Sequence, residues 1–309
     1  MMKHEFYYTS RDSVTKIHAI EWIPDGEVKG ILQICHGMVE YIDRYDDFAK
    51  FMCGHGYYVV GHDHLGHGKS IQTEADLGYF DERKGNQYVI GDIYRLQEMT
   101  KKKYPDAPYF MLGHSMGSFL LRQYLTMYAG GLSGAVIMGT GYQGALTLSA
   151  GRIVCRIIAA FKGWKYRSTF VDNLSFGGFN KKFEPGETSK EWITSDKKKR
   201  DEYVQDPLCS YTFTLGAYYQ MFTGMKVLVQ KESMERIPKT LPVLFTAGAD
   251  DPVGAFGKNV TRVYEKYKNA GIKDVSIHLY EGDRHEILNE VDRQNVYQDI
   301  LTWVEERNQ

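Results

Sequence analysis

The feature that most constrains the fold is a repeated pairing of short apolar runs with amphipathic segments. Continuous apolar runs, each typical of a buried strand, lie at residues 29–35, 56–61, 108–112 and 134–138. Segments with apolar residues at helical spacing follow the first three of these runs, at 44–54, 88–103 and 118–128. Strands that are apolar throughout are buried on both faces, so this pattern predicts a parallel sheet with helices on both sides.

The same pattern returns near the end of the chain after a long interruption. Strands are predicted at 242–247 and 275–279, and helices at 255–269 and 288–306. The interval 143–240 has no such alternation and is rich in basic, aromatic and methionine residues. We therefore predict an α/β core made of residues 1–142 and 241–309, with a mostly parallel central sheet. Residues 143–240 are predicted to form an inserted, mainly helical cap over the strand ends.

Composition narrows the class of protein further. The 309 residues are 43% hydrophobic and 25% charged, which is ordinary for a folded protein and excludes a disordered chain. A formal net charge of −1 gives no overall attraction to nucleic acid, so no nucleic-acid partner is expected. The four cysteines are widely spaced and form no C-x-x-C pair, which favours a reducing, cytoplasmic location.

No targeting or membrane-spanning segment is expected. The first residues have no apolar run behind them, which argues against a signal peptide. Residues 123–151 carry no charge and are long enough to span a bilayer. The Gly130-Gly131 pair interrupts this stretch, however, and predicts a helix end followed by a buried strand.

The pentapeptide GHSMG at residues 113–117 has the G-x-S-x-G pattern and stands between a predicted strand and a predicted helix. In that context the pattern predicts a sharp turn that exposes Ser115 in a strained backbone conformation. The helix that follows would direct its N–H groups and positive dipole end at an oxyanion formed there. The simpler alternative is a glycine-rich turn with an incidental serine.

A nucleophilic serine needs a histidine base and a carboxylate that orients the base. In α/β-hydrolases these residues occur in the order Ser, Asp or Glu, and His. The segment GADDPV at residues 248–253 follows a late predicted strand and offers Asp250 and Asp251. We favour Asp251, because it lies further out in the loop and Pro252 biases its backbone toward an extended form.

His285 follows the last predicted strand and is the histidine we expect to act as the base. The alternative, His278, lies inside that strand and is expected to pack against the protein. Ser115, Asp251 and His285 all fall just beyond the carboxyl ends of predicted strands. Functional sites of open α/β sheets collect at this edge.

An oxyanion needs two N–H donors, and the sequence offers two candidates. The loop at residues 36–40 follows the first central strand, and Gly37 allows its backbone to approach a substrate closely. We therefore expect the N–H groups of Met38 and Met116 to form the oxyanion hole. The alternative is an ordinary turn between a strand and a loop.

The segment HDHLGHG at residues 62–68 invites a metal-site interpretation, because three histidines and Asp63 could ligate zinc. Its H-D-H-x-x-H spacing does not reproduce a familiar metallohydrolase pattern. Gly66 and Gly68 are instead spaced for a tight turn that leads to Ser70. We expect a structural turn here, with neither a metal nor an organic cofactor in the chemistry.

Six segments in the right order resemble the monoacylglycerol lipase and lysophospholipase branch of the α/β-hydrolases. They are HGMVE with RY (36–40, 44–45), DHLGHGKS (63–70), GHSMG (113–117), DPLC (206–209), GADDPV (248–253) and HEILNE (285–290). The resemblance implies an α/β-hydrolase fold, with Ser115, Asp251 and His285 as the catalytic residues. It also implies that Met38 and Met116 supply the oxyanion donors. Within the cap it rests on residues 206–209 alone.

The predicted cap is basic, with 16 Lys and Arg against 10 Asp and Glu in residues 143–240. Residues 152–167 interleave basic residues with apolar ones at helical spacing, which suggests peripheral contact with a lipid surface. Alternatively, the apolar side of this helix covers the active site. Residues 211–229 are rich in aromatic residues and methionine, which suits either an acyl chain or the core of the cap. The basic run 197–200 is expected to be a solvated surface.

Together these features predict a serine carboxylic-ester hydrolase that forms an acyl-enzyme on Ser115. The resemblance and the apolar cap favour a small lipophilic ester as substrate, such as a monoacylglycerol or a lysophospholipid. A thioesterase or an aminopeptidase could use the same three residues. A binding protein that has kept the fold without the chemistry is the remaining alternative.

Overall fold

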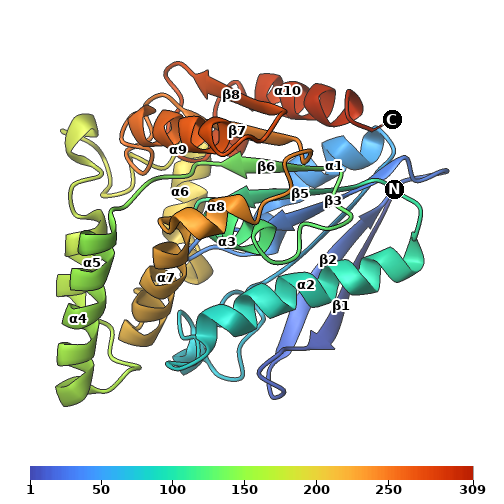
Figure 1. The fold of residues 1–309 in the computed structure, drawn as a ribbon. Coiled ribbons are helices and arrows are strands. Elements are labelled where there is room, and N and C mark those ends of the chain that lie inside the picture. Colours follow the sequence, from blue (N-terminus) through green and yellow to red (C-terminus); the bar gives the residue numbers. More distant parts are fainter. Residues whose placement is uncertain (309) are drawn as a thin grey trace.

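An eight-stranded sheet forms the centre of the molecule in the computed structural model, which describes residues 1–308 (Figure 1). The strands are β1 (Met2–Thr9), β2 (Lys16–Ile23), β3 (Gly30–Cys35), β4 (Tyr57–His62), β5 (Tyr109–His114), β6 (Gly134–Met138), β7 (Val243–Gly248) and β8 (Val275–Tyr280). Their order across the sheet is β1-β2-β4-β3-β5-β6-β7-β8. β2 pairs antiparallel with β1 and β4, and the other pairings are parallel. The prediction of a mostly parallel sheet is confirmed.

Helices cover both faces of this sheet, as the apolar strands predicted. On one face lie α1 (Asp46–Gly54) and α10 (Arg293–Glu305), and on the other lie α2 (Gly85–Lys103), α3 (Met116–Leu125) and α9 (Lys258–Asn269). The central strands β3 to β7 are buried at every residue. Short 3-10 turns complete the core and the loops: η1 (Ile42–Tyr45), η2 (Glu74–Asp76), η3 (Lys181–Phe183), η4 (Pro207–Cys209) and η5 (Ile287–Asn289).

Some helix boundaries differ from the predicted ones for local backbone reasons. Helix α9 begins at Lys258 rather than at residue 255, because Ala255, Phe256 and Gly257 have φ angles of 50°, 55° and 80°. Positive φ angles do not belong to a right-handed helix. Helix α3 begins two residues earlier than predicted, directly after Ser115.

All the remaining helices lie between β6 and β7. They are α4 (Ala145–Lys162), α5 (Thr169–Phe176), α6 (Lys197–Gln205), α7 (Leu215–Leu228) and α8 (Lys231–Glu235). Helix α7 packs on α2 and α3 of the core, and α4 packs on α7. Figure 1 shows α4, α5 and α7 beside the edge toward which the parallel strands point.

None of the helices in residues 1–308 combines the length and apolar composition that a bilayer-spanning segment needs. The uncharged stretch 123–151 forms the end of α3, strand β6 and the first turns of α4. The predicted helix end followed by a buried strand is therefore correct.

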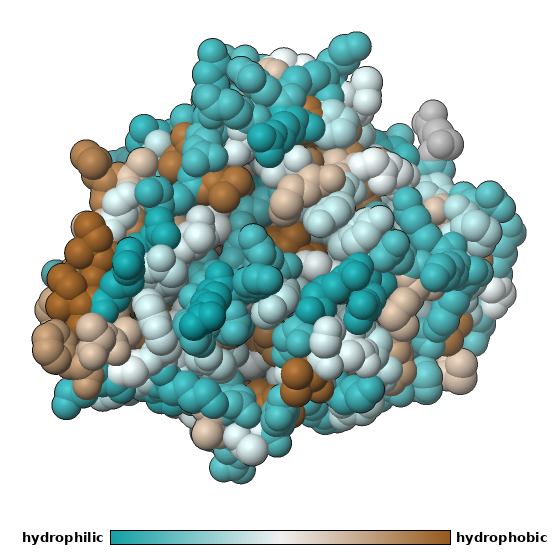
Figure 2. Space-filling view, turned by 60° about the horizontal axis from the view of Figure 1, so that its bottom comes forward, coloured by the Kyte–Doolittle hydropathy of each residue, from teal (hydrophilic) through white to brown (hydrophobic). Residues whose placement is uncertain are grey.

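The outer surface of α4 and α5 is apolar. Six side chains that are between 57% and 88% exposed form this α4–α5 apolar patch: Leu146, Ile153, Ile157, Phe161, Phe170 and Leu174. In Figure 2, apolar side chains gather at the left edge, the side on which Figure 1 places α4 and α5. The opposite side of α4 buries Leu148, Cys155 and Ala159. Helix α4 is thus apolar on two sides, only one of which is covered.

The histidine-rich segment after β4 forms a buried turn. The backbone N–H of His64 donates to His36 Nε2 at 2.9 Å, and His64 Nδ1 lies 3.1 Å from His62 Nε2. Asp63 accepts the N–H groups of Ile42 and Lys69, each at 2.8 Å. Within residues 1–308, no group of three or more His, Cys, Asp or Glu side chains is arranged to hold a metal ion.

Burial, reinforced by the charge of His36, lowers the pKa of both His62 and His67 to about 3. Between about pH 6.5 and pH 3 the unfolded chain therefore binds protons at these positions that the folded chain does not. Acidification through this range costs stability. Through each of these two histidines, a change from pH 7.5 to pH 5 is expected to lower the free energy of unfolding by about 2 kcal/mol.

The substitution His67→Asn tests this linkage, because asparagine keeps a donor for the Leu65 carbonyl group but does not titrate. At pH 7.5 we expect the free energy of unfolding of the variant to be lower than that of wild type, because the smaller side chain leaves a cavity. Between pH 7.5 and pH 5, however, the free energy of unfolding should fall by about 2 kcal/mol less in the variant than in wild type. Urea unfolding at both pH values measures the difference. His278→Asn, at a half-exposed position, is the control and should leave the wild-type pH dependence in place.

Candidate active site

Ser115 joins β5 to α3 in a backbone conformation that few residues adopt. Its φ and ψ angles are 52° and −119°, in a region that is strained for a residue with a side chain. Its N–H group donates to the carbonyl group of Met138 at 3.0 Å, which fixes the turn to the end of β6. Ser115 remains partly exposed although its sequence neighbours are buried.

The two glycines of the pentapeptide are required by close backbone contacts. A Cβ atom at Gly113 would lie 2.5 Å from the carbonyl oxygen of Gly117, and one at Gly117 would lie 2.0 Å from that of Cys35. No side chain fits at either position, because carbon and oxygen atoms do not approach so closely. The first turn of α3 is therefore packed directly against the end of β3.

The loop after β3 passes beside the serine. A Cβ atom at Gly37 would lie 3.0 Å from Cβ of Ser115. The N–H groups of Met38 and Met116 donate no hydrogen bond to another atom of residues 1–308. Two backbone donors without a hydrogen-bond partner therefore lie next to the serine in the chain or in the neighbouring loop.

Asp251 and His285 are in direct contact. Nδ1 of His285 lies 2.9 Å from Oδ2 of Asp251, which is fully buried. The other carboxylate oxygen, Oδ1, accepts the N–H group of Val253 at 2.8 Å. A carboxylate accepts hydrogen bonds only, so Nδ1 of His285 carries a proton and donates to Asp251, and Nε2 is the ring nitrogen that can accept a proton from another group.

The residues that the sequence offered as alternatives lie elsewhere. Asp250 forms an ion pair with Lys182 at the surface. His278 lies in β8, is half exposed, and stacks on Tyr280 with ring centroids 4.2 Å apart. Within residues 1–308, neither side chain forms a hydrogen bond with Asp251 or His285.

The serine and the histidine approach the same end of β6. The His285 ring lies 4.8 Å, centroid to centroid, from that of His114, the residue that precedes Ser115. The carbonyl group of Met138 binds the N–H group of Ser115, and the next residue is Gly139. A Cβ atom at Gly139 would lie 3.3 Å from Cε1 of His285. The three predicted residues therefore come from the carboxyl ends of β5, β7 and β8, at one edge of the sheet.

Trp192, for which no sequence pattern predicts a role, reaches this edge from the segment before α6. Its ring centroid lies 5.1 Å from that of His285. The carbonyl groups of Trp192 and Ile193 accept the N–H groups of His285 and Glu286, at 3.3 Å and 2.7 Å. No local pattern reveals these contacts, because they join segments that are far apart in the sequence.

One expectation for residues 197–200 was wrong in part. Arg200 is only 3% exposed, because its guanidinium group pairs with Glu191 at 2.8 Å. Lys197 and Lys198 are exposed, as expected for a solvated surface. Helix periodicity explains the difference, since one residue of a four-residue run turns toward the protein.

Comparisons with known proteins agree with this geometry. The family model described as serine aminopeptidase, S33, matches residues 26–292. Human monoglyceride lipase is 27% identical over 290 residues, which cover 93% of this chain and 86% of that protein. The monoacylglycerol lipase of Mycolicibacterium smegmatis is 25% identical, with 92% and 90% of the two chains covered.

Solved structures extend the likeness to the whole fold. A carboxyl esterase from Bacillus coagulans, determined in complex with glycerol, matches with a TM-score of 0.92 and 28% identity over 100% of both chains. A soluble variant of monoglyceride lipase from Saccharomyces cerevisiae, at 21% identity, matches with a TM-score of 0.78 over 99% of this chain and 96% of that one.

The fold is that of the α/β-hydrolases, and the protein is a serine hydrolase. Because the family model spans most of the sequence, the chain belongs to the serine aminopeptidase S33 family. The predicted resemblance to the monoacylglycerol lipase branch is confirmed by the relatives it matches.

The substitutions Asp251→Asn and Asp250→Asn form a matched pair that tests the assignment of the acid. Asp251→Asn presents an amide group to Nδ1 of His285 and favours the wrong tautomer, so we expect kcat for a p-nitrophenyl ester to fall about 10⁴-fold. Asp250→Asn removes only a surface ion pair and should leave kcat close to wild type. Steady-state kinetics of the two purified variants measure the effect, and the opposite ranking would assign the role to Asp250.

Proposed function

We propose that this chain hydrolyses lipophilic carboxylic monoesters, such as monoacylglycerols and lysophospholipids, through an acyl-enzyme intermediate on Ser115. The observation that carries the proposal is the buried Asp251–His285 hydrogen bond of 2.9 Å, at the sheet edge where Ser115 has a positive φ angle. An oriented imidazole base beside a strained, partly exposed serine is the arrangement that nucleophilic catalysis requires.

The first half of the reaction forms the acyl-enzyme. Nε2 of His285 takes the proton from Oγ of Ser115 as that oxygen attacks the ester carbon, and Asp251 stabilises the resulting imidazolium. The carbonyl oxygen becomes an oxyanion and accepts the N–H groups of Met38 and Met116. A donor of this kind lowers the barrier by about 3 kcal/mol. His285 then protonates the leaving alcohol oxygen as the carbon–oxygen bond breaks.

The second half releases the acid. Water replaces the alcohol, gives a proton to Nε2 of His285 and attacks the acyl carbon, and the same two N–H groups hold the second oxyanion. Collapse of this intermediate breaks the bond to Ser115 and returns the proton from His285 to the serine oxygen. No step requires a metal ion or an organic cofactor.

The side chains beside Met116 are mainly apolar, which favours a substrate with an acyl chain. Phe80, Val89, Phe119, Leu120 and Met221 line a small cavity there, between α2, α3 and α7, together with the polar residues Asn86 and Gln123. Aromatic residues supply contact area, and methionine adapts to a flexible chain. The substrates named for the relatives favour the same class, since these are monoglyceride and monoacylglycerol lipases.

The proposal includes the division of the chain into a core and a cap. In this view residues 1–142 and 241–309 supply the three catalytic residues, and residues 143–240 cover the edge at which they meet. The contacts of Trp192 with His285, and of α7 with α2 and α3, support this division.

The family description raises the alternative of an aminopeptidase. Binding a substrate ammonium group would require a free carboxylate near Ser115. Two glutamates near the site, Glu40 and Glu286, are buried and already paired with His114 and Arg44. This pairing favours an ester over a peptide with a free amino terminus.

A fluorophosphonate probe followed by an ester panel tests the proposed function. We expect the wild-type chain to be labelled and Ser115→Ala to be unlabelled while keeping its fold. Among p-nitrophenyl esters, monoacylglycerol, lysophosphatidylcholine, an acyl thioester and an aminoacyl anilide, the lipophilic oxygen esters should give the highest kcat/KM. An unlabelled wild type would indicate a binding protein, and a preference for the thioester or the anilide would assign the corresponding alternative.

We further propose that the α4–α5 apolar patch contacts the lipid surface on which such substrates reside. Arg156 and Lys162 lie next to this patch and are exposed, and the ion pairs within residues 1–308 include neither of them. Apolar side chains flanked by unpaired cations fit the interface of a membrane that carries anionic lipid. Because Ile153, Ile157 and Phe161 are exposed, they are free for such a contact.

The double substitution of Ile157 and Phe161 by serine tests the lipid contact. Losing two apolar anchors should weaken binding to phosphatidylcholine–phosphatidylglycerol vesicles at least about tenfold, with no change in the hydrolysis of a soluble ester. Vesicle co-sedimentation measures binding. Val14→Ser, at an exposed apolar position in the β1–β2 turn, is the control and should bind like wild type. Absence of wild-type binding to these vesicles would contradict the proposal.

A further inference from the structure

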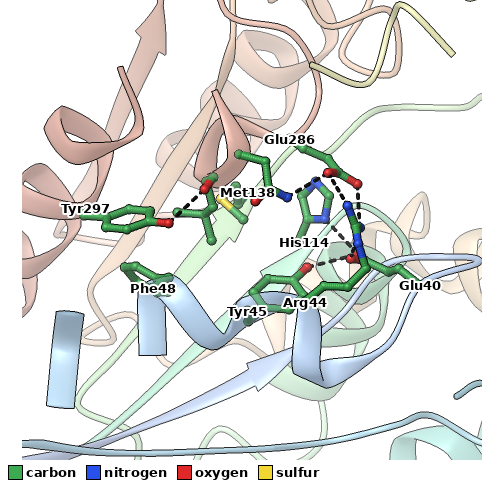
Figure 3. Close-up of a pocket in the computed structure, with 10 residues that line it drawn as sticks. Glu40, Arg44, Tyr45, Phe48, His114, Met138, Glu286 and Tyr297 are labelled. Carbon is green, nitrogen blue, oxygen red and sulfur yellow. Dashed lines mark hydrogen bonds and ion pairs between the residues drawn. The ribbon is translucent and has the colours of Figure 1, made fainter. Parts of the chain in front are cut away.

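A buried cluster of two acids and two bases lies beneath the catalytic residues. We refer to Glu40, Arg44, His114 and Glu286 as the ion quartet. Their side chains are between 4% and 11% exposed. Figure 3 shows them around a small cavity, with Arg44 reaching both glutamates and His114 beside them. The quartet belongs to none of the steps described above.

Both ring nitrogens of His114 face hydrogen-bond acceptors. Nδ1 lies 3.0 Å from Oε1 of Glu40, and Nε2 lies 3.3 Å from the carbonyl oxygen of His285. A carboxylate and a backbone carbonyl group can only accept. Both nitrogens must therefore donate, which makes His114 an imidazolium.

The surroundings of Glu40 keep it ionised and so support this protonation state. Its carboxylate also accepts the N–H group of Gly37, the hydroxyl group of Tyr45 at 3.0 Å and Nη1 of Arg44 at 2.9 Å. Burial favours the neutral acid, but the hydrogen bond and charge of His114, together with the charge of Arg44, lower the pKa of Glu40. Burial likewise opposes protonation of His114, and Glu40 outweighs it and raises the pKa of that imidazole.

With His114 protonated, the quartet carries two positive and two negative charges. Arg44 completes the pairing through a bidentate interaction with Glu286, with both nitrogen–oxygen distances at 2.8 Å. Paired, hydrogen-bonded charges can remain buried, whereas a single unpaired one would be costly. Removing one member therefore disturbs the other three.

The quartet is connected both to the loop after β3 and to the His285 loop. Glu40 accepts the N–H group of Gly37 in the loop that carries Met38. His114 directly precedes Ser115 and donates to the backbone of His285. Arg44 holds Glu286, the residue that follows His285.

We infer that His114 is a positioning residue that, as an imidazolium, holds the Gly37–Met38 loop and the His285 loop in place around Ser115. The inference rests on the proposed function for what is being positioned. His114 faces Glu40, Tyr45 and His285, with Arg44 and Glu286 behind Glu40 and with Asp251 behind His285.

The substitution His114→Gln removes this charge and one of the two donors. We expect kcat for p-nitrophenyl butyrate to fall about 10²-fold with little change in KM, because the catalytic groups, rather than the substrate, lose their alignment. Because glutamine does not titrate, the pH profile of kcat/KM should lose the decrease that deprotonation of His114 causes at high pH. A purely structural role would lower stability without removing this decrease.

His18 provides a matched control. It is buried and also lies between two carboxylates, with Nδ1 2.8 Å from Asp63 and Nε2 2.9 Å from Glu5, but it is part of the β1–β2 hairpin. His18→Gln should lose thermal stability as His114→Gln does, yet keep the wild-type kcat and pH profile. Equal kinetic effects of the two substitutions would overturn the inference.

Nitrogen-15 spectra of histidine-labelled wild-type protein give a readout that does not depend on turnover. At pH 7.5 both nitrogens of His114, assigned through their loss in His114→Gln, should show the shifts of an imidazolium, and a neutral tautomer would overturn the inference. If His114→Gln does not fold, the variant Glu40→Gln serves instead, because it removes the negative charge beside His114. The nitrogen shifts of His114 in that variant should be those of a neutral imidazole at pH 7.5. A wild-type chain without fluorophosphonate labelling would count against the proposed function, and the nitrogen shifts would still decide the state of His114.

Discussion

The arrangement of the site depends on one close contact between backbones. Gly117 in the first turn of α3 lies against the carbonyl group of Cys35 at the end of β3, with no room for even a Cβ atom between them. This contact brings the helix N-terminus, the serine and the loop after β3 within a few ångströms of one another. It also explains the strain at Ser115, since a chain that turns from β5 into so close a helix must pass through a positive φ angle. The surrounding strands, buried at every residue, supply the stability that holds the strained turn.

The parallel arrangement of the strands brings Asp251 and His285 to the same edge of the sheet as Ser115. Because β5, β6, β7 and β8 are neighbours and point the same way, the loops that follow them meet at one edge. The loop after β7 contributes Asp251, the loop after β8 contributes His285, and the end of β6 binds the serine N–H group. Loops are mobile unless something fixes them, and here buried charges do so. The ion quartet joins the loop after β3, the end of β5 and the loop after β8 through hydrogen bonds and ion pairs, so its members form one electrostatic unit.

The helices between β6 and β7 combine two different surfaces. The segment around Trp192 is joined to the core by backbone hydrogen bonds to His285 and Glu286. Helices α4 and α5 lie further out, since α4 packs on α7 rather than on the sheet, and they expose large apolar side chains. The inner surface therefore bears on the chemistry, while the outer surface is available for a partner. An amphipathic pattern in the sequence could not separate these two roles, because both sides of α4 are apolar.

The sequence by itself determined the elements, their order and the residues that the turns require. The apolar runs predicted the parallel strands, and the G-x-S-x-G pattern predicted the turn at Ser115, because strand burial and tight turns are local constraints on residue type. The sequence favoured Asp251 over Asp250 from its place in the loop, and the tertiary structure brings Asp251 against His285. Only the tertiary structure decided the pairing of Arg44 with Glu286, the burial of Arg200 and the contact of Trp192 with His285. These interactions join residues that are distant in the sequence, and no local pattern specifies which charges will be buried together.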